Sequence, residues 1–136
     1  MRRLFLDANV LFTAAHNPKG KAALICELGR AGLWQLITSA YALEEARRNI
    51  ARKYPHCLEP LENLGAALRL APEGGSAPCP PPLPDKDCPI YQAALACKAQ
   101  VLLTGDVRDF GFLMNAPEKA EGLLVQTVAG FLNSLP

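Results

Sequence analysis

The chain has 136 residues, of which 50% are hydrophobic, 20% charged and 7% aromatic, and this composition excludes a disordered or fibrous protein. The net charge is +1, so no overall basic field points to nucleic acid or to an anionic membrane. The apolar runs are too short to cross a bilayer and no signal peptide is evident, which favours a cytoplasmic protein with no membrane partner. From the length we expect a single domain over residues 1–136.

Short apolar runs alternate with stretches of helical spacing over the first half of the chain. The runs are typical of buried strands, and apolar residues three or four positions apart indicate amphipathic helices. Ser39 is a natural N-cap for one of these helices, and Pro55 ends it. In chain order we expect strand 3–6, a helix after Pro18 with its apolar face over 22–28, strand 33–37, helix 40–53, helix 58–66 and strand 67–71.

The second half begins with a proline-rich segment, residues 72–89, which holds seven of the 12 prolines. Such a segment forms neither a helix nor a central strand, so we expect an ordered or semi-extended surface loop. After it we expect helix 90–99, strand 101–103, strand 123–126 and a final helix capped by Thr127. This alternation predicts an α/β fold, a three-layer α/β/α sandwich around a mostly parallel sheet with the strand order 3-2-1-4-5.

The cysteines form no CxxC pair and are odd in number. We therefore interpret all five as unpaired, small buried or rim residues of a protein in a reducing compartment. They are Cys26, Cys57, Cys79, Cys88 and Cys97. His16 and His56 are isolated in the sequence, and we interpret both as loop or surface residues rather than as metal ligands or catalytic bases.

Acidic residues are placed where a functional site would form. Asp7 and Asp106 each follow an apolar strand directly. The carboxyl ends of parallel strands meet at one edge of a sheet, where α/β proteins build their sites, so both side chains are expected to face one cleft. Asp87, before the helix that leads into the fourth strand, and either Glu44 or Glu45, early in helix 40–53, are expected to join them.

Several carboxylates in one cleft require a positive charge between them. At an effective dielectric constant near 20, two carboxylates about 4 Å apart repel each other by roughly 4 kcal/mol. Oxygen ligands without His or Cys suit Mg²⁺ or Mn²⁺, which also bind phosphate oxygens. The pattern therefore favours metal-assisted hydrolysis of a phosphodiester.

Each acidic position also has an ordinary structural interpretation. Asp85 is typical of a turn, Asp87 could serve only as an N-cap, and Glu44 could pair with Arg48 on a solvated helix face. Asp7 is harder to explain in this way. It lies inside the apolar run LFLDANVLF, where a carboxylate without partners is costly.

Three segments resemble motifs of the PIN-domain nuclease family. The first, LFLDANVLF, is similar to the family's opening strand followed by Asp-x-Asn, which maps onto Asp7 and Asn9. The second, TSAYALEEARRNI, resembles its serine-initiated helix with a metal-site glutamate six positions after the serine. This rule selects Glu45, with Glu44 as its rival because Glu44 lies nearer the apolar helix face.

The third segment, DKDCPIYQAALACKAQVLLTGD, is similar to the family's Asp-x-Pro-Ile helix, which leads into a strand and Thr-Gly-Asp. It maps onto Asp87, Thr104 and Asp106. Asp109 matches a further acidic position that many members carry, and the closing VQTVAGFL resembles the family's last strand and helix.

The resemblance implies a ribonuclease that cleaves single-stranded or structured RNA with one or two Mg²⁺ or Mn²⁺ ions. The implied catalytic and metal-binding acids are Asp7, Glu45, Asp87 and Asp106, with Asp109 as a further metal ligand and Asn9 and Thr104 as accessory residues. Many small free-standing PIN proteins are the dimeric toxins of toxin–antitoxin pairs, so we expect a homodimer and an antitoxin partner. The proline-rich insertion at 72–89 departs from the commoner toxin pattern.

Basic residues near the acids are candidates for binding the RNA backbone. Lys86 and Arg108 lie beside Asp87 and Asp106 in the sequence, and Arg48 lies on the helix that carries Glu45. That helix concentrates four positive charges, which favour either an RNA track or, more commonly, a solvated helix face. They are Arg47, Arg48, Arg52 and Lys53.

Two other functions compete with the nuclease. A phosphatase of the haloacid dehalogenase type needs a second acid two residues after its nucleophile, and Asn9 stands there. A non-catalytic RNA-binding or scaffold module could keep the same fold without its metal. The presence of four family acids argues against that alternative.

Overall fold

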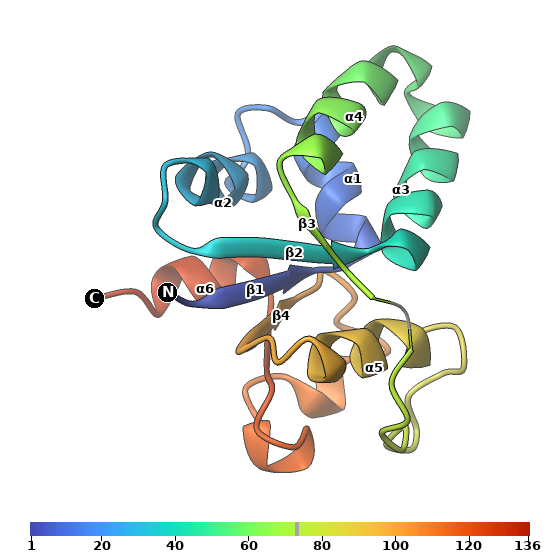
Figure 1. Cartoon of the computed structure of the whole chain (residues 1–136), viewed down its shortest axis with the longest axis vertical. Coiled ribbons are helices and arrows are strands. Elements are labelled where there is room, and N and C mark those ends of the chain that lie inside the picture. Colours follow the sequence, from blue (N-terminus) through green and yellow to red (C-terminus); the bar gives the residue numbers. More distant parts are fainter. Residues whose placement is uncertain (73) are drawn as a thin grey trace.

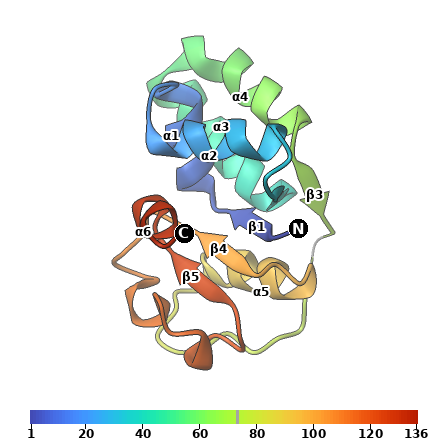
Figure 2. The ribbon, with the colours of Figure 1, turned by 90° about the vertical axis from the view of Figure 1, so that its left-hand side faces the viewer.

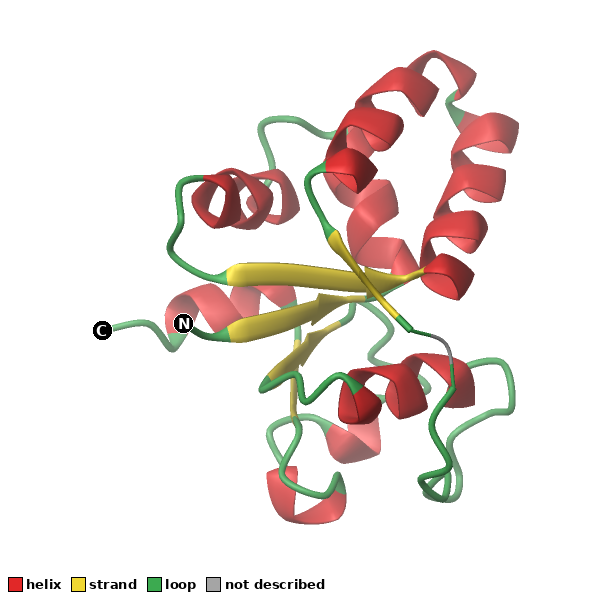
Figure 3. Ribbon diagram, in the orientation of Figure 1, coloured by secondary structure: helices red, strands yellow, loops and turns green. Residues whose placement is uncertain are grey.

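A computed structural model describes residues 1–72 and 74–136, and its core is a five-stranded, fully parallel sheet (Figures 1 and 3). The strands are β1 (Arg3–Leu6), β2 (Gln35–Ser39), β3 (Arg69–Ala71), β4 (Val101–Leu103) and β5 (Leu124–Gln126). Their order in the sheet is β3-β2-β1-β4-β5, which confirms the predicted order. The chain therefore reverses its direction of winding between β1 and β4, where α/β sheets form their binding sites.

Helices cover both faces of the sheet, which confirms the three-layer architecture. They are α1 (Ala8–His16), α2 (Lys21–Arg30), α3 (Ala40–Lys53), α4 (Leu58–Ala66), α5 (Cys88–Ala96) and α6 (Val128–Asn133). Helices α1 to α4 lie on one side and α5 on the other, while α6 packs against α2 (Figures 1 and 2). In the described part of the chain, no helix is long and apolar enough to span a membrane.

The central strands are buried on both faces, as parallel strands require. Phe5 and Leu102 are fully buried, and β1 pairs with β4 in a register that places Leu6 beside Leu103. The next residues, Asp7 and Thr104, therefore leave the sheet side by side, and the Asp7 amide donates a hydrogen bond to the Leu103 carbonyl at 3.0 Å. The sheet register thus brings the first and last sequence motifs together.

Most expected elements are present, and some of them have shifted ends. Helix α3 covers residues 40–53 as expected, and the Ser39 hydroxyl caps it by accepting a hydrogen bond from the Ala42 amide at 3.1 Å. Strand β2 begins at Gln35 rather than at residue 33. Helix α5 starts at Cys88 and ends at Ala96, before the expected residue 99, because Lys98 adopts a left-handed backbone conformation with φ 59°.

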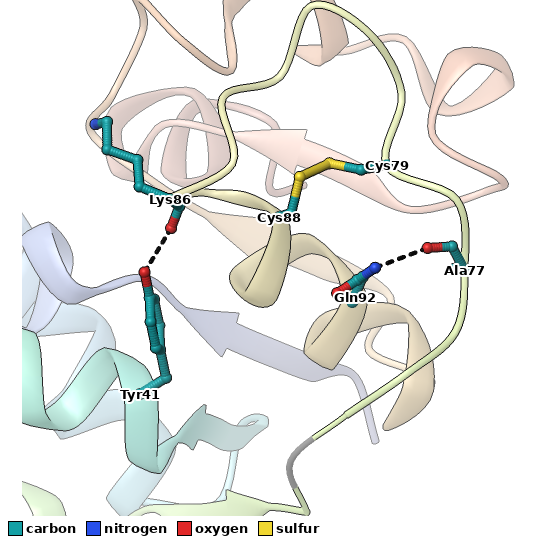
Figure 4. The surroundings of a disulfide bond; sticks show 6 residues. All are labelled: Tyr41, Ala77, Cys79, Lys86, Cys88 and Gln92. Atoms are coloured by element: carbon teal, nitrogen blue, oxygen red, sulfur yellow. Dashed lines mark hydrogen bonds between the residues drawn. A yellow bond between two sulfur atoms is a disulfide. The ribbon is translucent and has the colours of Figure 1, made fainter.

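The interpretation of all five cysteines as unpaired is wrong, because Cys79 and Cys88 form a disulfide (Figure 4). Backbone hydrogen bonds from Leu83 to Pro80 and from Asp87 to Pro84 fold the proline-rich loop back on itself and bring the two cysteines together. Sequence spacing alone does not reveal such a return of the chain. The other three cysteines are free, and two of them, Cys26 and Cys57, are buried.

Candidate active site

A cleft of about 700 Å³ opens at the carboxyl ends of β1 and β4. Four carboxylates line it, and each comes from a different part of the fold. Asp7 follows β1, Glu45 lies on α3, Asp87 precedes α5 and Asp106 follows β4. The structure therefore brings together the four acids that the sequence places in three separate motifs.

Asp7 is held in the cleft by three hydrogen bonds. Its Oδ1 accepts from the Ala8 amide at 2.7 Å, so the residue caps α1 and only 4% of it is exposed. Its Oδ2 accepts from the Thr104 hydroxyl at 2.8 Å and from the Asn9 side-chain amide at 3.2 Å. The accessory residues Asn9 and Thr104 thus orient the first carboxylate.

The same two residues also fix the turn that carries Asp106. The Asn9 Oδ1 accepts from the Gly105 amide at 2.6 Å, and the Thr104 Oγ1 accepts from the Asp106 amide at 3.1 Å. A Cβ at Gly105 would lie 3.2 Å from the Asn9 Oδ1, so a glycine permits this close approach. The Thr-Gly-Asp sequence is therefore a rigid support for Asp106 against Asp7.

A fifth carboxylate, that of Asp109, lies beside two of these four. Oxygens of Asp87, Asp106 and Asp109 fall within 4.8 Å of one another. Lys86 is the nearest cation, with its Nζ 3.1 Å from an oxygen of Asp109 and 3.7 Å from Oδ2 of Asp87. Three acids facing one exposed lysine leave an excess of negative charge.

One carboxylate oxygen of Asp87 lacks a hydrogen-bond donor in the described part of the chain. Its Oδ2 is buried and accepts no hydrogen bond among the described residues, and its side chain does not cap α5. The interpretation of Asp87 as only an N-cap is therefore wrong. Burial raises the pKa of Asp87 from 3.8 to about 6, Lys86 opposes this rise, and the charges of Asp106, Asp7 and Asp109 add to it.

The pKa of Asp7 is also raised. Burial raises its pKa, the hydrogen bonds from Thr104 and Ala8 oppose the rise, and the charges of Glu45 and Asp106 add to it. A hard divalent cation fits this donor set, because carboxylate oxygens are its preferred ligands and the buried Oδ2 of Asp87 accepts no hydrogen bond among the described residues. The nearby lysine offers only part of the compensating charge.

The structure distinguishes the two adjacent glutamates of α3. Glu45 is half-buried and lines the cleft, whereas Glu44 is exposed and forms an ion pair with Arg47. Glu44 therefore pairs with Arg47 and not with Arg48, the partner that the sequence suggested. This bond to Arg47 lowers the pKa of Glu44.

Of the three basic residues that the sequence suggests for RNA binding, one lines the cleft. Lys86 lines the cleft, whereas Arg108 and Arg48 are exposed and do not line it. Sequence reasoning missed Lys21, which enters the cleft from the first turn of α2. No local motif marks it, because the turn between α1 and α2 brings it there. The cleft also includes Thr13 of α1 and the start of α6.

The proline-rich loop is held at Lys86 and at Cys88, the residues before and after Asp87 in the sequence (Figure 4). The Tyr41 hydroxyl donates to the Lys86 carbonyl at 2.8 Å, and the disulfide holds Cys88. Further out, the Gln92 side-chain amide donates to the Ala77 carbonyl at 2.9 Å. Asp87 is therefore fixed by loop contacts as well as by the helix that follows it.

Comparison with known proteins identifies the family of this chain. A family model described as PIN domain matches residues 3–108, more than half of the chain, and the protein belongs to the PIN-domain family of nucleases. No curated protein matches the sequence.

Two solved structures share the fold. One is VapBC2 from Rickettsia felis bound to a DNA fragment from its promoter, with a TM-score of 0.64, 13% identity, and coverage of 92% of this chain and 98% of that chain. The other is VapBC-1 from nontypeable Haemophilus influenzae, with a TM-score of 0.58, 17% identity, and coverage of 93% and 98%. At these identities the similarity establishes the fold.

Proposed function

We propose that the protein is a metal-dependent ribonuclease that hydrolyses phosphodiester bonds in RNA at the cleft between β1 and β4. The observation that carries this proposal is the buried Oδ2 of Asp87, which accepts no hydrogen bond among the described residues and faces the carboxylates of Asp106 and Asp109. Family membership supports nuclease chemistry, and the oxygen donor set supports Mg²⁺ or Mn²⁺.

Asp7, Glu45, Asp87 and Asp106 would hold one or two ions, with Asp109 at the edge of the site. When bound, the metal supplies positive charge that offsets the carboxylates and the charge developing on the phosphate. Asn9 and Thr104 keep Asp7 in place through their hydrogen bonds.

Two lysines at the cleft are suited to hold the RNA backbone. Lys86 lies beside the carboxylates and Lys21 lines the same cleft from α2. Ammonium groups in these positions would attract phosphates and place the scissile bond near the carboxylates. The exposed Arg108 and Arg48 would act only on parts of the RNA outside the cleft.

We further propose that the protein acts with an antitoxin partner and as a homodimer in the cytoplasm. The support for an antitoxin is that the two solved structures described above carry the name VapBC and that the match covers 98% of each of their chains. Co-purification with the product of a neighbouring gene, followed by loss of RNA cleavage in the complex, would test the antitoxin.

Cleavage of a labelled single-stranded RNA in Mn²⁺, Mg²⁺ or EDTA tests the activity. We expect metal-dependent cutting that falls at least about 100-fold in Asp7→Asn and Asp106→Asn. Asp85→Asn is the matched control, because Asp85 is an exposed turn residue outside the cleft. If RNA is bound but not cut by the wild type in either metal, the protein is a scaffold or RNA-binding module instead. Equal cutting by all variants would identify a contaminating ribonuclease.

A further inference from the structure

A cluster of aromatic rings lies outside the cleft, where α1 and α3 end. Tyr54, the residue after α3, stacks on His16, the last residue of α1, with ring centroids 4.7 Å apart and planes 14° apart. Phe12 and His56 also contact Tyr54, but their rings are inclined to it by 49° and 89°. The cluster is accessible, since 37% of Tyr54 is exposed.

Helix α1 connects this cluster to the cleft. Asn9 and Thr13 line the cleft, and His16 follows at the helical spacing of i, i+4 and i+7, so all three lie along one helix face. Helices α1 and α3 pack together, and both run away from the carboxyl edge of the sheet (Figure 1). At about 1.5 Å per residue, His16 lies about 10 Å along α1 from Asn9.

Helix α3 provides a parallel path. Arg48 and Arg52 follow Glu45 at i+3 and i+7, and Tyr54 lies about 13 Å further along the helix direction than Glu45. A stacked nucleic-acid strand advances about 3.4 Å per nucleotide. The distance from the cleft to the rings therefore matches three to four nucleotides.

The charges along this path suit an RNA backbone. Residues 47–57 contain four Lys and Arg and no Asp or Glu. In the part of the chain that the structure describes, Arg48 and Lys53 form no salt bridge, and the Lys53 Nζ lies 5.8 Å from the centre of the Phe12 ring. Arg47 is the exception, because it pairs with Glu44.

We propose that the His16–Tyr54 ring pair binds a base of single-stranded RNA, three to four nucleotides from the bond that is cut. This inference rests on the proposed ribonuclease function. Parallel rings offer a flat face on which a base can stack, and such stacking tolerates any base because each has a π-face. The neighbouring cations would hold the phosphates between the ring pair and the cleft.

Fluorescence of 2-aminopurine tests the stacking directly. The probe is a ten-nucleotide RNA that carries 2-aminopurine at one position at a time, because its fluorescence is quenched when it stacks on a ring. We expect quenching at one position, three to four nucleotides from the cleavage point, with the wild type and Tyr54→Phe. Tyr54→Leu keeps apolar bulk without a ring, and it should abolish the quenching and weaken RNA binding about 10-fold.

Two further variants complete the test. His16→Leu removes the other ring of the pair and should also lose the quenching. Leu33→Ala is the control, because Leu33 is an exposed apolar residue outside the cluster, and its binding should match the wild type. A wild type that cuts RNA without quenching at any such position, or a Tyr54→Leu variant that binds as tightly as the wild type, overturns this inference and leaves the ribonuclease intact. A wild type that neither cuts nor binds RNA overturns both.

Discussion

Replacement of Asp87 by asparagine should stabilise the metal-free protein at neutral pH. Burial raises the pKa of Asp87 from 3.8 to about 6, so its ionised form is disfavoured in the folded state. At about 1.4 kcal/mol per pKa unit, ionisation of this carboxyl lowers the free energy of unfolding at pH 7.5 by at most about 3 kcal/mol. This pKa already includes the attraction of Lys86, and screening by solvent reduces the effect, so we expect a net gain of about 1–2 kcal/mol.

The sign of the effect depends on pH. The unfolded chain releases this proton near pH 4, whereas the folded protein keeps it until about pH 6. Between these values the folded state binds more protons, and the wild type therefore loses stability as the pH rises. Below about pH 4 both states are protonated, and the advantage of the variant should be small.

Urea unfolding in EDTA at pH 4.5 and 7.5 measures this difference. Trp34, the single tryptophan, is buried before β2, at the edge of the sheet opposite the cleft, and its fluorescence reports unfolding. Asp85→Asn is again the control, since that exposed carboxyl should leave stability unchanged at both pH values. An Asp87→Asn variant that is less stable than the wild type, or equally shifted at both pH values, would refute the reasoning.

Five further substitutions test three other features of the structure. Glu45→Gln should abolish metal-dependent cleavage, whereas Glu44→Gln should cut RNA at the wild-type rate because Glu44 points away to Arg47; the opposite result would exchange their roles. Thr104→Val removes the hydroxyl that donates to the buried Asp7 carboxylate and should cost about 1–3 kcal/mol in the free energy of unfolding, measured by urea; an unchanged midpoint would show that this bond contributes nothing. Cys79→Ser removes the disulfide between two cysteines that are nine positions apart and should lower the free energy of unfolding by about 2–3 kcal/mol under oxidising conditions. Cys97→Ser should leave it unchanged, because Cys97 forms no disulfide; equal stability of both variants would contradict the disulfide.

The sheet order and most helices could be predicted from the sequence. Helix α3 is marked by Ser39 at its start, regular apolar spacing and a proline beyond its end, so local signals agree with the tertiary structure. Helix α1 was not predicted, because its apolar residues continue directly from β1. In LFLDANVLF the strand ends at Leu6 and the helix begins at Ala8, with Asp7 as the cap between them. Short apolar runs do not distinguish strand from helix.

Residues placed by loops could not be predicted. Lys21 enters the cleft because the turn after α1 places the first turn of α2 beside it. Cys79 meets Cys88 because the proline-rich loop folds back on itself. Both depend on how segments without regular structure return to the core, which periodicity does not encode. The acids, in contrast, follow strands or begin helices, so the parallel topology alone brings them close.

Binding of Mn²⁺ to the purified protein tests most directly whether the cleft acids form a metal centre. Electron paramagnetic resonance detects free Mn²⁺ and loses this signal when the ion binds to protein. We predict that the wild type and Asp85→Asn take up one or two ions per chain, and that Asp87→Asn and Asp106→Asn bind at least about 10-fold more weakly. Equal binding by all four proteins, or no binding by the wild type, would contradict a metal centre built from these carboxylates.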